Sequence, residues 1–235
     1  MKELIKKTPL LKHVHHHYAA TKYKQKFAED CYGCFWGVFD TFEEAIRSAP
    51  ATKNIGYDRA DLAQEYQIML DRGDWESSTS MVRAFDYPVL YWIGKITQNT
   101  TLNHVRFFDF GGNLGIHFLN YANYLDFPST LQWIVCDLPE IVKVGTLVSK
   151  DPRLTFTTDF ELANGSDIFL ASGSIQYVND DIATKINALE QKPQHLLINR
   201  IGLYKERKLS RFKMVAKFFI HSLYLIEVNL LVHWS

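Results

Sequence analysis

The stretch HVRFFDFGGNLG, which is residues His104–Gly115, decides the fold that the sequence predicts. An apolar run ends in Asp109, a loop with three glycines follows, and residues 116–125 have the pattern of a helix. Glycine has no Cβ, so a ligand can approach the main chain of such a loop closely. The helix after the loop begins with free N–H groups. The order strand, acid, glycine loop and helix therefore predicts a binding site for a small cofactor.

A second apolar run, residues 131–136, ends in Asp137, which lies 22 positions after Gly115. A βαβ nucleotide-binding fold places its ribose-binding carboxylate at about this distance. Similar runs alternate with helical patterns along the chain: strands at 104–109, 131–136, 153–158, 167–171 and 195–199, and helices at 114–125, 139–149 and 179–190. This alternation predicts an α/β fold, with a Rossmann-like parallel sheet and helices on both faces.

The first hundred residues are rich in aromatic side chains and have helical patterns. A capping-box pattern at 41–44 predicts a helix to about 48, and Asp58 is expected to cap a second helix to about 70. A third helix is expected from Ser77 or Ser78 to about 97, with a kink at Pro88. We expect three parts: 1–100 as a helical lid or substrate cover, 101–207 as the sheet domain, and 208–235 as an atypical tail.

Composition favours a soluble globular protein of 235 residues, with 47% hydrophobic and 22% charged residues. Lys+Arg and Asp+Glu are both 26, so the basic excess that is typical of nucleic-acid binding is absent. The N-terminal sequence has no apolar core of a signal peptide, and the chain has only 3 Cys. We therefore expect a cytoplasmic protein without a nucleic-acid partner, and the oligomeric state stays open.

The end of the chain is unusually apolar. Residues 214–234 are long enough to raise the question of a membrane span, but charged and polar side chains interrupt them. A buried helix or a pair of strands is the expected structure.

The spacing of the glycines bears on the choice of cofactor. Gly111, Gly112 and Gly115, with Asn113 between them, do not fit the G-x-G-x-x-G fingerprint of nicotinamide cofactors. The order Asp109-Phe110-Gly111 instead resembles the first motif, D/E-x-G, of class I S-adenosylmethionine-dependent methyltransferases, and a tight turn without any ligand is the structural alternative.

Residues 104–200 resemble the catalytic domain of class I S-adenosylmethionine-dependent methyltransferases. The run CDLPEIV, residues 136–142, is similar to a D-L-P-x-V motif of small-molecule O-methyltransferases, and TTDF, residues 157–160, is similar to their next motif. The resemblance implies that Asp109 organises the glycine loop and that Asp137 holds the ribose hydroxyls. It also implies a set of further cofactor contacts: Leu138, Asp159, Phe160, Ser172 and Gly173.

The pattern over about residues 31–207 is similar to a family of predicted methyltransferases whose genes lie with bacterial surface-polysaccharide genes. It implies methyl transfer from S-adenosylmethionine to a small-molecule acceptor, such as a sugar or polysaccharide precursor. Two other functions stay open. One is a degenerate, inactive methyltransferase fold that acts as a binding module, and the other is a nucleotide-dependent oxidoreductase.

The sequence departs from the plant-type O-methyltransferases at Gln176, where they carry a catalytic His. Gln does not accept a proton, so Gln176 either orients a substrate hydroxyl or caps a turn. No other residue is a convincing general base, since His117 is placed on a helix and His195 opens a strand. The catalytic residue is therefore unknown at this stage.

The second departure is the C-terminus, where the usual helix and antiparallel hairpin after the fifth strand are not visible. We expect the hairpin to be missing or altered by truncation or frameshift, and the tail to pack irregularly on the 104–200 sheet.

A zinc site is a further alternative, because Cys31 and Cys34 follow a group of histidines within residues 13–17. In a zinc finger, however, the cysteine pair comes before a spaced pair of histidines, so no metal is expected here.

Overall fold

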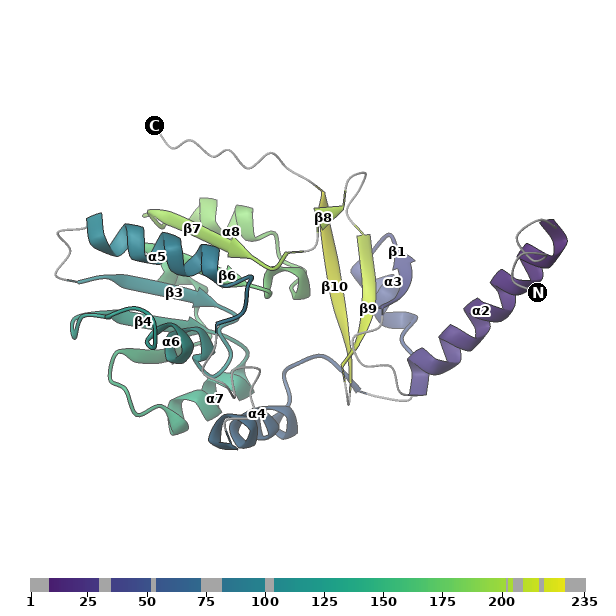
Figure 1. Ribbon diagram of the computed structural model, residues 1–235, viewed down its shortest axis with the longest axis horizontal. Helices are drawn as coiled ribbons and strands as arrows, with labels where there is room; N and C mark the ends of the chain where they lie inside the picture. Colours follow the sequence, from purple (N-terminus) through teal and green to yellow (C-terminus); the bar gives the residue numbers. More distant parts are fainter. Residues whose placement is uncertain are drawn as a thin grey trace. The chain divides into compact units, whose positions relative to one another are not determined.

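The computed structural model describes residues 9–29, 35–51, 54–72, 82–99, 104–201, 203–204, 209–215 and 218–226. The chain forms two compact units. One is the continuous segment Tyr57–Leu203, and the other joins Met1–Gly56 to Tyr204–Ser235. The units differ from the boundaries expected from the sequence, because strands from the two ends of the chain pair with each other (Figure 1). The role of the first hundred residues as a lid stays a prediction.

The Tyr57–Leu203 unit contains the predicted parallel sheet. Its strands are β3 (Arg106–Phe110), β4 (Gln132–Cys136), β5 (Leu154–Thr157), β6 (Ile168–Ser172) and β7 (His195–Asn199). Their order is β5-β4-β3-β6-β7, and every neighbouring pair is parallel. The chain therefore moves outward from β3 in one direction, then crosses back and moves outward in the other. The Rossmann-like fold predicted from the sequence is confirmed.

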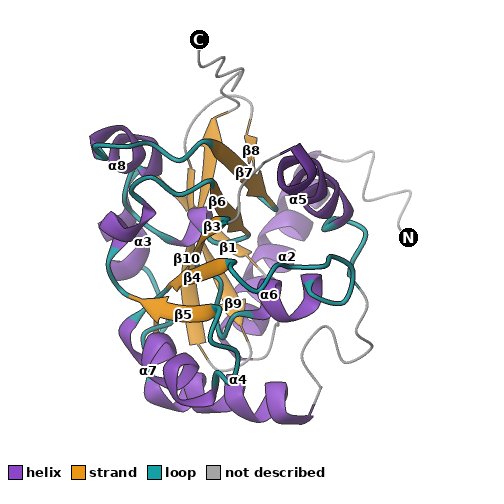
Figure 2. Cartoon of the chain, turned by 90° about the vertical axis from the view of Figure 1, so that its left-hand side faces the viewer, coloured by secondary structure: helices purple, strands orange, loops and turns teal. Residues whose placement is uncertain are grey.

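Helices cover both faces of this sheet. Helix α6 (Ile116–Tyr121) follows β3, α7 (Pro139–Val148) follows β4, and α8 (Ile182–Ala188) connects β6 to β7. Right-handed crossovers in opposite directions along a sheet put their helices on opposite faces. Figure 2 shows α6 and α8 on opposite sides of the strands.

The alternation of side chains along the strands explains how both faces are filled. Phe107 of β3 stacks on Trp133 of β4 with ring centroids 4.3 Å apart, and both belong to the core beneath α6 and helix α5 (Tyr87–Asn99). The next residue of β3, Phe108, contacts Phe169 and Phe160 on the other face. The inner strands β4, β3 and β6 are therefore buried on both sides, as their apolar runs predicted, whereas the edge strand β7 is only partly buried.

The helices before the sheet differ from their predicted bounds. Helix α5 begins at Tyr87, and Pro88 lies in its first turn, where a missing N–H costs nothing, so the predicted kink does not occur. The predicted start at Ser77 or Ser78 lies outside the described residues. Helix α4 (Ala60–Arg72) packs against α7 through Ala63, Leu114 and Ile141.

The second unit is built from both ends of the chain. Its sheet has the order β1-β9-β10-β2, with β8 also pairing with β10, and helices α2 (Pro9–Glu29) and α3 (Phe42–Arg47) accompany it. Its strands are β1 (Phe35–Phe39), β2 (Asn54–Ile55), β8 (Leu203–Tyr204), β9 (Leu209–Val215) and β10 (Phe218–Ile226). Thr41 caps α3 as predicted, with Oγ1 accepting from Glu44 N at 3.0 Å.

The tail is therefore a strand pair, which confirms one of the two structures expected for it. β9 and β10 pair in regular antiparallel register from Phe218–Val215 to Tyr224–Leu209. The expectation of irregular packing on the 104–200 sheet is wrong, because these strands find their partners in β1 and β2 instead. No helix within the described ranges is long and apolar enough to cross a membrane.

Two glycines of the Tyr57–Leu203 unit give a matched test of this architecture. Gly115 has a φ of +79°, and a Cβ there would lie 2.6 Å from Cδ2 of Leu154 on β5. Gly115→Ala should therefore lower the unfolding free energy by about 1–3 kcal/mol, from backbone strain and overpacking. Gly94→Ala in α5, where the nearest atom is 3.7 Å away, should raise it by about 0.5–1 kcal/mol. Urea unfolding of the two variants measures both effects, and equal effects would contradict the packing described here.

Candidate cofactor-binding site

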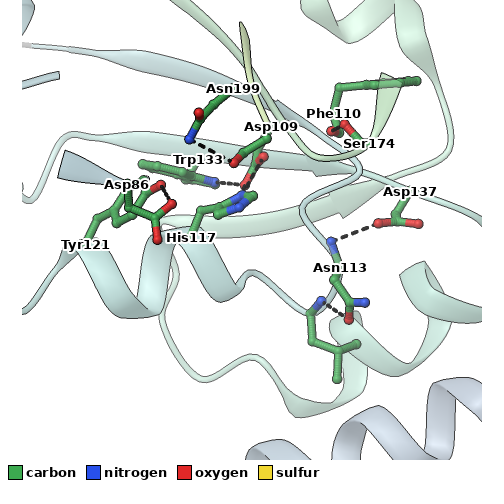
Figure 3. A network of polar contacts seen from close by, with 12 residues as sticks. Asp86, Asp109, Phe110, Asn113, His117, Tyr121, Trp133, Asp137, Ser174 and Asn199 are labelled. Atoms are coloured by element: carbon green, nitrogen blue, oxygen red, sulfur yellow. Dashed lines mark hydrogen bonds and ion pairs between the residues drawn. The ribbon is translucent and has the colours of Figure 1, made fainter. Parts of the chain in front are cut away.

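The predicted site residues meet at the carboxyl edge of the parallel sheet. Asp109 ends the buried part of β3, Asp137 follows β4, and Gly173 follows β6. Because all the strands are parallel, their carboxyl ends share one edge, which is where ligands bind in open α/β sheets. Figure 3 shows two sets of polar contacts at this edge, one around Asp109 with His117 and Trp133, and one between Asp137 and Asn113.

Asp109 is a fully buried carboxylate with partners inside the protein. Its exposed fraction is 0%, and Oδ2 accepts from Trp133 Nε1 at 3.1 Å. His117 Nδ1 lies 3.0 and 3.1 Å from its two oxygens. Burying a carboxylate is costly unless it is hydrogen-bonded, and these contacts supply the bonds. The geometry supports an organising role for Asp109, because the carboxylate has no exposed oxygen that a ligand would touch.

Asp137 connects β4 to the glycine loop. Oδ2 accepts from Asn113 N at 2.8 Å, and Oδ1 accepts from Leu138 N at 2.7 Å. Burial raises the pKa of Asp137 to about 6, although both N–H bonds act in the opposite direction. Each carboxylate oxygen has further lone pairs, so Asp137 keeps the capacity to accept from ligand hydroxyls.

The loop itself needs its glycines. A Cβ on Gly112 would lie 2.4 Å from Oδ2 of Asp109, so only glycine lets the main chain pass over that carboxylate. Gly111 has a φ of +72°, and a Cβ there would lie 2.3 Å from the Cβ of Ser174. Asn113 also has a positive φ, 53°, and its Oδ1 accepts from Leu114 N. The loop is therefore held between the ends of β4 and β6.

The main-chain N–H groups of this loop correct one expectation in part. The sequence predicted free N–H groups at the start of the helix, but the N–H of Ile116 donates within the protein, as do those of the loop residues 111 and 113 to 115. The N–H groups of His117 and Phe118, in the first turn of α6, have no acceptor among the described residues. Gly111 N donates to Cys136 O, and both Gly115 N and Ile116 N donate to Gly112 O. α6 is also only 6 residues long. The loop thus presents its Cα atoms beside the Asp137 carboxylate, and most of its amide N–H groups are already used.

Asp159 and Phe160 lie at the end of β5. Asp159 is exposed, and its Oδ1 accepts from Glu161 N at 2.9 Å, which caps the short 3-10 helix η1 (Phe160–Ala163). Phe160 is half-buried and contacts the rings of Phe110 and Phe169. The TTDF motif, residues 157–160, therefore has a structural role at the end of β5, and the predicted contact of Asp159 and Phe160 with adenine stays a prediction.

The ends of β6 and β7 are joined by polar contacts. Ser172 is buried, and its Oγ lies 3.5 Å from Asn199 Nδ2, while Gly173 N donates to Asn199 O. Gln176 is also buried; its Nε2 donates to Arg200 O at 3.2 Å, and its Oε1 is a buried acceptor without a partner among the described residues. Gln176 therefore fixes the turn after β7 and offers one acceptor oxygen.

A short segment before α4 contacts both sides of this edge. Tyr57 packs edge-on against Tyr177, which follows β6, with ring centroids 5.6 Å apart. Asp58 was expected to cap α4, but its Oδ1 accepts from Glu140 N at the start of α7, at 3.2 Å. Residues 57–58 thus contact both the β4 side and the β6 side of the edge, and the role of this segment as part of a lid stays a prediction.

His117 is the residue that sequence reasoning missed. It was set aside as a helix residue, yet the structure brings it against Asp109, eight positions earlier. Burial lowers its pKa, but the charge and hydrogen bond of Asp109 outweigh this, so the pKa of His117 is raised. The sequence feature that could have identified His117 is its position in the first turn of the helix after the loop, because a side chain there points back toward the preceding strand.

Cysteine and metal chemistry find no support at this edge. Burial, with the charges of Asp137 and Asp159, raises the pKa of Cys136 to about 12, so its thiol stays protonated. Across the described residues, no group of His, Cys, Asp or Glu has the arrangement of a metal site. Cys31 and Cys34 lie outside the described residues, so the structure does not test the zinc site considered from the sequence.

Comparison with known proteins gives matches in structure alone. No protein-family model and no curated protein sequence matches the chain. One similar structure is CalS10 from Micromonospora echinaspora, an amino pentose methyltransferase with bound SAM, at 13% identity, a TM-score of 0.39, and coverage of 71% of this chain and 84% of that chain.

Two further structures are SAM-dependent methyltransferases in complex with S-adenosyl-L-homocysteine. The one from Thiobacillus denitrificans has 15% identity and a TM-score of 0.35, and the match covers 55% of this chain and 54% of that one. The one from Geobacter sulfurreducens has 16% identity and a TM-score of 0.33, with 48% and 47% covered. The chain thus spans about half the length of these two proteins.

The raised pKa of Asp137 predicts a pH dependence of stability. A carboxyl group whose folded pKa lies above its unfolded value favours folding at low pH, and this contribution is lost as pH rises through about 6. Wild type should therefore lose stability relative to Asp137→Asn between pH 4 and 7.5. Urea unfolding across that range measures the difference, in which other titrating groups cancel. Parallel curves for the two proteins would contradict the assignment.

Proposed function

We propose that the Tyr57–Leu203 unit binds S-adenosylmethionine at the carboxyl edge of its sheet and transfers the methyl group to a small-molecule acceptor. The observation that carries the proposal is the internal use of the loop N–H groups. A dinucleotide cofactor needs those groups for its pyrophosphate. S-adenosylmethionine has no phosphate, and its ribose needs acceptors instead, which Asp137 supplies beside the loop. The same observation disfavours the nucleotide-dependent oxidoreductase.

The charge of the edge supports the same choice. The charges of Asp58 and Asp109 raise the pKa of Asp137. Those of Asp109, Asp137 and Asp159 raise the pKa of Cys136, whereas Lys185 lowers it. An excess of carboxylates of this kind favours a cationic ligand over an anionic one. S-adenosylmethionine carries a positive sulfonium and an ammonium group, so its charge fits the edge.

The proposed contacts follow from the geometry of each residue. Asp137 accepts from the two ribose hydroxyls, while Gly111 and Gly112 let the cofactor lie on the main chain. Leu138 is partly exposed beside Asp137 and is proposed to pack against the adenosine moiety with Asp159 and Phe160. Ser172, Gly173 and the free acceptor Oε1 of Gln176 are proposed to line the methionine or acceptor side.

When bound, the cofactor supplies an electrophilic sulfonium methyl. The protein residues then have to align the acceptor with the methyl carbon and keep water away. Residues 57–58, which span the two sides of the edge, are proposed to provide part of that cover. The acceptor is proposed to be a sugar or a related polysaccharide precursor, and this finer assignment rests on the resemblance described for the sequence.

Calorimetry with S-adenosylhomocysteine, S-adenosylmethionine and NAD tests the proposal. Binding of the first two without binding of NAD is the expected result. Binding of NAD alone would favour an oxidoreductase. Binding of none of the three would favour the degenerate fold that acts as a binding module.

Asp137→Ala should weaken S-adenosylhomocysteine binding by at least about tenfold. Two charge-assisted bonds from hydroxyls contribute about 1.5–3 kcal/mol each, and about 1.4 kcal/mol corresponds to a factor of ten. Asp126→Ala is the matched control, since Asp126 is an exposed acid in the loop before β4. Circular dichroism checks that both variants fold. Equal affinity of a folded Asp137→Ala variant and wild type would remove Asp137 from the site.

A further inference from the structure

The contact between Asp109 and His117 has the form of a carboxylate that orients an imidazole. Nδ1 of His117 lies 3.0 and 3.1 Å from the two oxygens of a carboxylate with no exposed surface. Trp133 Nε1 donates to the same carboxylate and fixes it from the neighbouring strand. An ionised carboxylate accepts only, so Nδ1 carries the proton and Nε2 of the neutral ring is left with a lone pair.

The other edge of the ring faces away from this buried pair. The His117 side chain is 14% exposed, although Asp109 beneath it is 0% exposed. His117 is not among the described residues with a fully buried polar side-chain atom that lacks a partner, so an unpartnered Nε2 keeps some exposed surface. No hydrogen bond from Nε2 to a described residue is present. His117 therefore presents a proton-accepting atom at the carboxyl edge of the sheet.

Further polar groups hold the ring in place. His117 stacks on Tyr121 with centroids 5.7 Å apart, and Tyr121 Oη donates to Asp86 at 3.1 Å. Asp86 lies before α5, and Arg200 lies after β7, where its guanidinium is 4.3 Å from the centre of the Phe85 ring. Figure 3 shows His117 between Asp109 and the Tyr121–Asp86 pair. The ring is thus supported from several elements of one unit.

We propose that His117 is the catalytic proton acceptor for a hydroxyl or ammonium group of the methyl acceptor, and that Asp109 is its positioning residue. This inference rests on the proposed function and deepens it, because it names the chemical class of the acceptor: a group with a proton to lose. The proposal also assigns to His117 the role of general base, which the Gln176 amide cannot perform because it does not accept a proton.

The proton and electron balance of the step is complete. The acceptor O–H or N–H proton moves to Nε2, a lone pair of that oxygen or nitrogen forms the bond to the methyl carbon, and the carbon–sulfur bond breaks with its electron pair going to sulfur. The imidazolium is stabilised by the Asp109 carboxylate and later returns its proton to water. Positioned proton transfer of this kind contributes about 10²–10⁴-fold to a rate.

The charges around His117 set its pH response. Asp109 and Asp86 favour the protonated ring, whereas burial and Arg200 favour the neutral ring, and the net effect is a raised pKa. Tyr121 stays neutral, because burial and Asp86 raise its pKa. Methyl transfer should therefore increase with pH as the imidazole loses its proton, above the usual range for histidine.

Nitrogen-detected NMR of the full chain tests the histidine without any ligand. The His117 signals are assigned by their loss in His117→Gln. The expected result is a pKa above 6.5 and, at higher pH, a neutral ring with Nδ1 protonated and Nε2 unprotonated. Asp109→Asn, if folded by circular dichroism, should lower this pKa. A neutral ring protonated at Nε2 would overturn the proposal.

Calorimetry and transfer assays separate this inference from the proposed function. His117→Gln should bind S-adenosylhomocysteine within about twofold of wild type, and His104→Gln, at an exposed position before β3, is the matched control. With any hydroxyl or amine compound that wild type methylates, His117→Gln should lower kcat by about 10²-fold or more. Unchanged turnover, or a parallel loss of cofactor affinity, would overturn the role of His117. Failure of wild type to bind S-adenosylhomocysteine would instead overturn the proposed function, with the NMR result still standing.

Discussion

The buried carboxylate of Asp109 is the constraint on which the site depends. A charge without solvent contact must find its hydrogen bonds inside the protein, and Asp109 finds them in Trp133 of the neighbouring strand and in His117 of the following helix. Trp133 in turn stacks on Phe107 in the core. The carboxylate thus links the hydrophobic interior of the sheet to the polar edge above it. Only glycine at position 112 lets the chain turn over that carboxylate, so the same group fixes the course of the loop.

Much of the parallel sheet was predictable from the sequence. Its inner strands are buried on both faces, so each is a short apolar run, and acids or glycines mark the ends of the first two. These signals are local, and the strands of the structure fall at the predicted places. The bounds of the helices were less accurate. Pro88 was expected to bend a helix but lies in its first turn, because the position of a proline within a helix depends on where the helix starts.

The contacts of the site were harder to predict, since they depend on distances across the chain. Asp137 was expected at the end of β4, but nothing in the sequence indicated that it would bind the N–H of Asn113. Free N–H groups were expected at the start of the helix, but Ile116 N donates to Gly112 O, and the loop N–H groups of Gly111 and Asn113 donate to Cys136 O and to the Asp137 carboxylate. Of the second sheet, only a strand pair in the tail was among the expectations, and its pairing with β1 and β2 was missed. Its strands from the two ends of the chain complete each other, and neither end has a clear pattern by itself.

The pairing of β1 with β9 has a consequence for the order of folding. Phe35 is opposite Lys213, so this sheet requires closure of a loop that contains the whole Tyr57–Leu203 unit. Closing a long flexible loop costs entropy before any contact compensates for it. A folded Tyr57–Leu203 unit replaces most of that flexible chain by a body with fixed ends. The continuous unit is therefore expected to fold first and to template the discontinuous one, because the partners of the N-terminal strands are synthesised only after the Tyr57–Leu203 unit.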